Sequence, residues 1–174
     1  MNFCSHCGKK DLVLKVPEND SIPRIICESC GTIHYENPKI IVGTIPVKDG
    51  KVLLCKRAIP PKVGKWTLPG GYMENGETAE EGASRETWEE AKAKVDIKRL
   101  HTIYSLPHVN QVYLFFLAEL ISDFSVGPES LEVKLFEENE IPWKDLVFSS
   151  ARYALKKFFE NRSEVQTHQG VFML

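Results

Sequence analysis

The 174-residue sequence lacks several features that would assign its class directly. It has no run of about 18 apolar residues of the kind that crosses a membrane, and residues Met1-Asn2-Phe3-Cys4 lack the charged and apolar regions of a signal peptide. It has no large excess of either charge, because 22 Lys and Arg residues oppose 24 Asp and Glu residues. Balanced charge argues against a broad nucleic-acid-binding surface. We therefore expect a cytoplasmic globular protein with no membrane partner.

Cysteine is scarce, but four of the five cysteines form two Cys-x-x-Cys pairs. Cys4 and Cys7 make the first pair, and Cys27 and Cys30 follow after 19 intervening residues. This spacing is typical of a four-thiolate zinc ribbon. Because the protein would fill all four positions of the tetrahedron, the Zn²⁺ is expected to be structural. The fifth, Cys55, lies in an apolar run and is expected to be a buried small hydrophobe.

The ribbon is expected to be a small domain of residues 1–36. So short a segment has little core of its own, and zinc binding would supply most of its folding free energy, on the order of 10 kcal/mol. Within residues 1–31 four basic residues balance four acidic ones. The ribbon therefore carries no electrostatic signature of nucleic-acid binding.

Residues 37–174 are expected to form a second domain with mixed secondary structure. Two strand-like runs, 39–47 and 51–56, are separated by a segment that contains Asp49-Gly50, a strong hairpin signal. Residues 112–120 (VYLFFLAEL) read as a buried strand. A final helix is predicted from Ser149 onward, with Ser149 or Ser150 as its cap. Strands and helices without regular alternation indicate an α+β fold.

Residues 74–90 are strongly acidic, with seven glutamates and one basic residue, Arg85. Thr78 and Glu81 form a capping box, which predicts a helix from Thr78 to about residue 91. On that helix Glu86, Glu89 and Glu90 share one face, since they are separated by three and four residues. Clustered carboxylates raise one another's proton affinity unless a cation lies between them. Such a face suits a hard divalent cation such as Mg²⁺.

A glycine within this helix, and an alternative interpretation of its charge, need to be considered. Gly82 lies on the same arc as Glu86 and is expected to leave room for a loop, a metal or a substrate. The alternative is an ordinary solvated acidic helix, with pairs such as Arg85 and Glu89 on its surface.

The motifs around this helix resemble the Nudix box. Gly71 and Glu77 stand at the expected spacing before Arg85-Glu86-Thr87-Trp88-Glu89-Glu90. Together with the cysteine pairs, three segments are similar to the zinc-ribbon-bearing FAD and ADP-ribose pyrophosphatases: LCKR at 54–57, GKWTLPGGYME at 64–74 and GPESLE at 127–132.

The resemblance implies an α/β/α sandwich on a mixed sheet and hydrolysis of a nucleoside diphosphate linked to another moiety. FAD or ADP-ribose is the expected substrate, with AMP as a product. Carried over by position, the carboxylates of Glu86, Glu89 and Glu90 would bind Mg²⁺ or Mn²⁺, helped by the carbonyl of Gly71. Glu77 and Arg85 would brace the loop against the helix.

The resemblance leaves several residues with open roles. Arg57 is a candidate phosphate ligand. Glu129 and Glu132 are both candidates for a further carboxylate that serves as base or ligand or contacts substrate, and Glu129 is slightly favoured as the base. The aromatic candidates for contact with the nucleobase are Tyr104, Tyr113, Phe115 and Phe116, although aromatic residues in such strands are more often core.

One position departs from the family pattern. The family usually has glycine where this chain has Lys92, at the position that ends the helix in a left-handed turn. Lysine there predicts either backbone strain or a longer helix.

Other functions stay open at this point. NADH pyrophosphatases also carry a zinc ribbon, but the segment Tyr104-Ser105-Leu106-Pro107-His108 does not match their downstream motif. A nucleoside-triphosphate pyrophosphohydrolase and a non-enzymatic ADP-ribose-sensing regulator are the remaining alternatives. A homodimer is possible, since related pyrophosphatases often dimerise.

Overall fold

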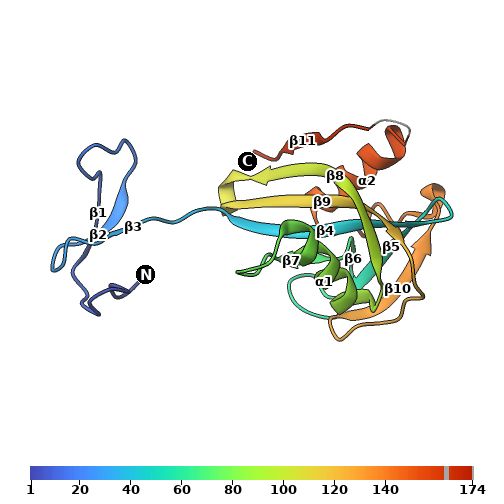
Figure 1. The fold of residues 1–174 in the computed structure, drawn as a ribbon, viewed down its shortest axis with the longest axis horizontal. Helices are drawn as coiled ribbons and strands as arrows, with labels where there is room; N and C mark the ends of the chain where they lie inside the picture. Colours follow the sequence, from blue (N-terminus) through green and yellow to red (C-terminus); the bar gives the residue numbers. More distant parts are fainter. Residues whose placement is uncertain (163–164, 174) are drawn as a thin grey trace. The chain divides into compact units, whose positions relative to one another are not determined.

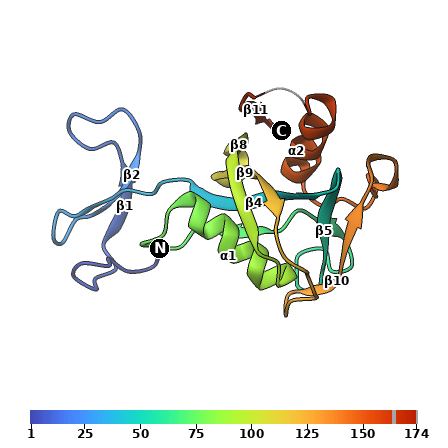
Figure 2. The same cartoon turned by 45° about the vertical axis from the view of Figure 1, so that its right-hand side comes forward.

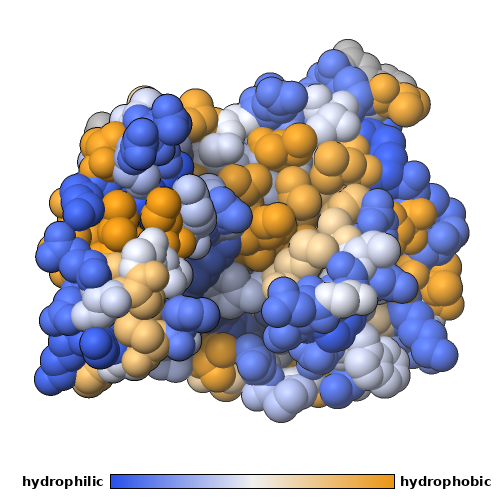
Figure 3. Space-filling view, turned by 60° about the vertical axis from the view of Figure 1, so that its left-hand side comes forward, coloured by the Kyte–Doolittle hydropathy of each residue, from blue (hydrophilic) through white to orange (hydrophobic). Residues whose placement is uncertain are grey.

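The computed structural model describes residues 1–162 and 165–173, which fall into two compact units, Met1–Asn37 and Pro38–Leu174. Residues 163, 164 and 174 of the expected second domain lie outside the described residues. Among the described residues, no helix is long and apolar enough to cross a membrane. Figure 3 shows one face of the molecule, on which hydrophobic residues gather in patches between hydrophilic ones.

The first unit is a three-stranded antiparallel sheet. Its strands are β1 (Leu12–Lys15), β2 (Arg24–Cys27) and β3 (Ile33–His34), in the order β1-β2-β3. Cys4, Pro17, Ile26 and Cys27 are its buried apolar residues among those described. A core of this size cannot offset the conformational entropy of folding such a unit without another source of stability.

The second unit is built on a mixed sheet, as the resemblance implies. The path β10-β5-β4-β9-β8-β11 contains two parallel pairs, β4 with β9 and β11 with β8. The short strands β6 and β7 lie off this path and pair with β5 and β4. The strand bounds are β4 (Lys39–Lys48), β5 (Lys51–Arg57), β6 (Trp66–Thr67), β7 (Gly70–Tyr72), β8 (Val95–Leu106), β9 (Gln111–Leu120), β10 (Ser130–Phe136) and β11 (His168–Val171).

The predicted hairpin joins β4 to β5. Asp49 and Gly50 both have positive φ, at 51° and 76°, which is the signature of a type I′ turn. Its twist matches that of the two strands, which pair Val47 with Val52 and Lys48 with Lys51. The Asp-Gly signal is therefore confirmed.

Two helices cover opposite faces of this sheet, α1 (Ala79–Ala91) and α2 (Ser149–Glu160) (Figures 1 and 2). The alternation of β4 explains the arrangement, since successive side chains point to opposite faces. Ile45 packs in a cluster with Leu155 of α2, whereas Val42 packs in a cluster with Ala83 of α1. The predicted sandwich is confirmed. Two short 3₁₀ helices, Pro107–Val109 and Glu138–Glu140, complete the described elements.

The predicted serine cap of the last helix is wrong. Phe148 occupies the N-cap position in an extended conformation, and no side chain caps the helix. Ser149 and Ser150 already belong to α2, and the hydroxyl of Ser150 is buried with no hydrogen-bond partner. Apolar packing of Phe148, Ala151 and Leu155 on the core fixes this end of the helix instead.

Lys92 ends α1 in the left-handed conformation, with φ of 49°. Its backbone N–H donates to the carbonyl of Trp88 at 2.8 Å. Its ammonium lies 5.6 Å from the centroid of the Trp88 ring, within the range of a cation–π contact. The helix therefore stops where the family glycine would stop it, and lysine accepts the strain.

Candidate active site

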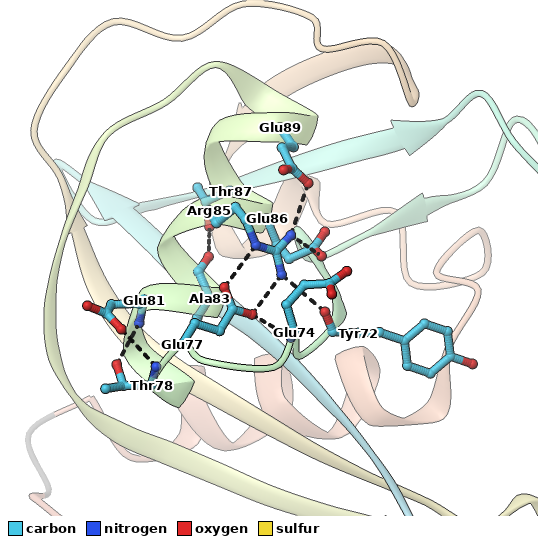
Figure 4. Close-up of polar contacts among 10 residues, drawn as sticks. All are labelled: Tyr72, Glu74, Glu77, Thr78, Glu81, Ala83, Arg85, Glu86, Thr87 and Glu89. Carbon is cyan, nitrogen blue, oxygen red and sulfur yellow. Dashed lines mark hydrogen bonds and ion pairs between the residues drawn. The ribbon is translucent and has the colours of Figure 1, made fainter.

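The first turn of α1 is held by the predicted capping box (Figure 4). The hydroxyl of Thr78 accepts from the N–H of Glu81 at 3.1 Å, and the Glu81 carboxylate accepts from the N–H of Thr78 at 2.8 Å. These bonds satisfy two backbone donors that the helix leaves without partners. They also fix the rotation of α1, and with it the direction of the later glutamates.

Glu86, Glu89 and Glu90 all line one cavity of about 670 Å³. Their environments differ, because Glu89 is exposed, Glu86 is half-buried and Glu90 is only 6% exposed. Burial, reinforced by the charge of Glu86, raises the pKa of Glu90 to about 8. Burial also raises the pKa of Glu86. A buried, crowded carboxyl group of this kind is not part of a solvated helix face, and a bound cation would favour its ionised form.

Arg85 connects the helix to the loop before it (Figure 4). Its guanidinium makes a bidentate ion pair with Glu77, with Nε and Nη2 at 3.0 and 2.9 Å from the two carboxylate oxygens. Nη1 also donates to Glu86 at 2.7 Å and to Glu89 at 3.1 Å, and Nη2 donates to the carbonyl of Tyr72 at 3.1 Å. The pKa of Glu77 falls to about 2 because of these bonds from Arg85. One side chain thus orders the loop and two cavity carboxylates.

Two glycines let these parts approach each other. A Cβ on Gly71 would lie 2.6 Å from the Glu86 carboxylate. A Cβ on Gly82 would meet the Glu77 carboxylate at 2.5 Å and the side chain of Val42 at 2.9 Å. Of the three uses expected for the space beside Gly82, the described structure shows the approach of a loop residue, Glu77.

Arg57 lies in the cavity wall. Its guanidinium donates to the carbonyls of Pro61 and Pro60 at 2.9 and 3.2 Å and lies 5.3 Å from the centroid of the Phe148 ring. The charge of Arg57 acts to lower the pKa of Glu90, against the larger effect of burial. A cation held beside the carboxylates is suitably placed to contact a phosphate group.

Of the two candidates for an additional carboxylate, Glu129 and Glu132, the structure places one in the cavity and one outside its lining. Glu129 lines the cavity, and its charge contributes to the raised pKa of Glu90. Glu132 is outside the cavity lining, and its carboxylate pairs with the ammonium of Lys56 at 3.3 Å. The reason is the strand pairing, which sets Glu132 of β10 directly opposite Lys56 of β5.

The four candidate aromatics also separate. Tyr113 and Phe115 line the cavity, whereas Tyr104 and Phe116 are buried outside its lining. Tyr113 and Phe115 are two residues apart on β9 and so face the same side of the sheet, whereas Phe116 faces the other side. The cavity residues that were not predicted from the sequence include Tyr72, Gln111 and Phe148. The period of two on β9 was a signal for Gln111, which stands two residues before Tyr113.

The four paired cysteines of the first unit form a separate cluster. Their sulfur atoms all lie within 4.8 Å of one another, and two pairs, Cys4 with Cys30 and Cys7 with Cys27, are 3.7 and 3.6 Å apart. A zinc tetrahedron with bonds of about 2.3 Å has edges of about 3.8 Å. The cluster therefore fits a structural Zn²⁺. Cys55 is 1% exposed in β5 and confirms the expectation of a buried residue.

Comparison with known proteins identifies the class. The NUDIX domain profile matches residues 38–158, and the Nudix N-terminal zinc-ribbon profile matches residues 2–36. The chain therefore belongs to the NUDIX family. Its class is that of the NUDIX hydrolases, and it carries the zinc-ribbon extension of that family.

One solved structure and two curated relatives illustrate the similarity to individual family members. A crystal structure of a NUDIX hydrolase from Nitrosomonas europaea is 54% identical, covers 99% of both chains and superposes with a TM-score of 0.94. An ADP-ribose pyrophosphatase from Methanocaldococcus jannaschii is 36% identical over 114 residues, which are 62% of this chain and 67% of that protein. An NAD-capped RNA hydrolase NudC from Chromobacterium violaceum is 36% identical over 118 residues, which are 67% of this chain but only 42% of the relative.

Proposed function

We propose that this protein is a divalent-metal-dependent pyrophosphatase that cleaves the diphosphate of a nucleoside diphosphate linked to a second moiety. ADP-ribose and FAD are the favoured substrates, and AMP is the expected product. The observation that carries the proposal is the convergence of Glu86, Glu89 and buried Glu90 on one cavity that also contains Arg57. The similarity to an ADP-ribose pyrophosphatase supports the choice of substrate.

The residues divide the work by position. Glu86, Glu89 and Glu90, with the carbonyl of Gly71, are proposed to hold Mg²⁺ or Mn²⁺. When bound, such a metal neutralises the diphosphate and activates the attacking water. Arg57 is proposed to bind a phosphate oxygen.

The proposed reaction adds water across the anhydride. One phosphorus–oxygen bond forms to the water oxygen as the bond to the bridging oxygen breaks. Glu129 is proposed to accept the proton of the attacking water, because it lines the cavity while Glu132 is paired with Lys56. From ADP-ribose this yields AMP and ribose 5-phosphate.

A substrate panel tests this function. The 174-residue protein is incubated with ADP-ribose, FAD, NAD⁺, NADH and nucleoside triphosphates in Mg²⁺ or Mn²⁺, and products are identified by chromatography. We expect AMP from ADP-ribose or FAD, and no turnover in a chelator of divalent cations. Tight binding of ADP-ribose without turnover of any compound would instead support a sensor.

A second candidate is cleavage of an NAD-type dinucleotide. It is favoured by the similarity to NAD-capped RNA hydrolases, although the chain spans about two fifths of the length of the C. violaceum relative. Faster hydrolysis of NADH than of ADP-ribose and FAD in the same panel would favour this candidate.

The ribbon is proposed to hold one structural Zn²⁺ through Cys4, Cys7, Cys27 and Cys30. The geometry of the sulfur cluster supports this assignment. Nucleic-acid binding is not proposed for the ribbon, whose charge is balanced. A homodimer stays a prediction.

A further inference from the structure

A row of side chains crosses three neighbouring strands at the cavity. Tyr72 of β7 is paired with Ile41 of β4, and Ile41 is paired with Tyr113 of β9. Paired residues face the same side of a sheet, so all three side chains point to the face that lines the cavity. Gln111 stands two residues before Tyr113 and shares that face.

The amide of Gln111 is held between the two tyrosine hydroxyls. Its Nε2 donates to the hydroxyl of Tyr72 at 3.2 Å, and its Oε1 accepts from the hydroxyl of Tyr113 at 3.1 Å. A primary amide has two donor hydrogens and two acceptor lone pairs. After these bonds, one donor and one acceptor stay available on adjacent atoms at the cavity wall.

The wall of the cavity beside this amide includes two aromatic rings, those of Tyr113 and Phe115. The rings of Tyr113 and Phe115 are stacked, with centroids 6.2 Å apart and planes inclined by 25°. Phe115 lies so close to Gly43 that a Cβ there would come within 2.9 Å of its ring. Aromatic faces of this kind are the usual platform for a nucleobase.

Tyr72 links this wall to the carboxylate helix. Its backbone carbonyl accepts from Arg85 at 3.1 Å, while its hydroxyl accepts from Gln111. Figure 4 shows its ring extending away from the Arg85 cluster. A nucleoside diphosphate in the cavity could therefore place its diphosphate at the carboxylates of α1 and its base beside Gln111 and Tyr113.

We infer that Gln111 is a specificity-determining residue that recognises the edge of an adenine base stacked on the ring of Tyr113. The inference rests on the proposed function, because it assigns the base of the same substrate. Adenine presents an amino donor at N6 beside a ring-nitrogen acceptor, and glutamine pairs with both in a bidentate contact. The hydrogen bonds to the hydroxyls of Tyr72 and Tyr113 would orient the amide before the substrate arrives, which lowers the entropic cost of binding.

The test exchanges the hydrogen-bonding pattern at constant size. Gln111→Glu replaces the amide donor by a second acceptor, which opposes the adenine ring nitrogen but suits the adjacent N–H donors of guanine. The values of kcat/KM are measured for ADP-ribose and for GDP-ribose, which share the same second moiety. We expect the ADP-ribose to GDP-ribose ratio to fall about 10- to 100-fold in this variant.

Glu119→Gln is the matched control, since Glu119 is on the same strand but outside the cavity lining and pairs with Lys98. Its substrate ratio should equal that of the unmodified protein. Equal losses for both substrates in Gln111→Glu, in a variant that folds normally, would overturn the inference while leaving the proposed hydrolysis intact.

A binding measurement separates this inference from the proposed function. Calorimetric affinities for AMP and GMP are determined in the unmodified protein and in Gln111→Glu, without turnover. If neither ADP-ribose nor FAD is hydrolysed, the proposed function fails. A fall in the AMP to GMP affinity ratio would still support base recognition by Gln111, and an unchanged ratio would overturn it.

Discussion

The Glu86 carboxylate lies directly against Gly71 and occupies the space that the Cβ of any other residue at position 71 would need. A Cβ at position 71 would approach the carboxylate carbon and both oxygens to 2.6 Å, closer than Cβ atoms come to non-bonded atoms in folded proteins. The strand that carries Gly71 is paired with β4, so its backbone cannot easily withdraw. The position of a proposed metal ligand thus depends on the absence of a side chain.

Gly71→Ala should therefore displace the Glu86 carboxylate and weaken the metal site. We expect the Mg²⁺ concentration for half-maximal activity to rise at least about 10-fold, as for other changes to groups that orient metal ligands. Titration of activity with Mg²⁺ measures this. Gly76→Ala is the control, because φ of 89° strains alanine there while nothing lies within 4 Å of its Cβ. Equal Mg²⁺ dependence in the two variants would contradict the account.

Arg85→Lys should destabilise the fold through the loss of bidentate geometry. Lysine keeps the charge but cannot contact both Glu77 oxygens and the carbonyl of Tyr72 in the same way. We expect a loss of about 1–3 kcal/mol in the free energy of unfolding, measured by chemical denaturation. Arg162→Lys changes an exposed pair with Glu138 and should cost less than about 1 kcal/mol. A smaller effect at Arg85 than at Arg162 would count against the bracing role.

Zinc content tests the ribbon independently. Purified protein should contain about one Zn²⁺ per chain by mass spectrometry of metals, since the four sulfur atoms lie within 4.8 Å of one another. Cys7→Ser should lose this metal, whereas Cys55→Ser should keep it because Cys55 is buried in the sheet of the other unit. Native protein free of zinc would refute the assignment.

The stability of the fold should fall in mild acid because of His101. Burial, aided by the charges of Arg99 and His168, lowers the pKa of His101 to about 4 from an unfolded value of about 6.5. Below about pH 6.5 the unfolded state therefore binds more protons than the folded state. The contribution of His101 to the free energy of unfolding is complete above that pH. It is lost as the pH falls towards 4, by roughly 3 kcal/mol in total.

Denaturation curves between pH 4 and 7 measure this loss. His101→Gln should have a flatter pH dependence, whereas His108→Gln, at an exposed position, should keep the original one. The same slope in all three proteins would show that His101 is not responsible.

Local signals explain which parts of the fold were predictable. Thr78 and Glu81 predict the start of α1, and Asp49-Gly50 predicts the hairpin, because each acts through bonds or dihedrals within a few residues. The long strand β8 escaped prediction. Its pairing with β9 has register shifts between Ile97 and Arg99 and again between Leu100 and Thr102, which interrupt the alternation of a regular strand.

The residues of the candidate site likewise include some that local spacing predicts and others that it does not. The shared face of Glu86, Glu89 and Glu90 follows from helical spacing alone. Tyr72, Gln111 and Phe148 come from separate segments that only long-range packing and strand register bring to one cavity. No periodicity within one segment specifies such register. The separation of Glu129 from Glu132 likewise depends on the pairing of β10 with β5.

The central claim is that buried Glu90 serves a metal-dependent hydrolysis, and a pair of substitutions tests it most directly. Glu90→Gln keeps the size of the side chain and removes its charge, whereas Glu80→Gln makes the same change at an exposed position of α1 outside the cavity. The measurement is kcat for AMP release from ADP-ribose in saturating Mg²⁺, on variants shown to be folded. The account predicts a loss of at least about 100-fold for Glu90→Gln and less than about 2-fold for Glu80→Gln. Full activity in Glu90→Gln would contradict it.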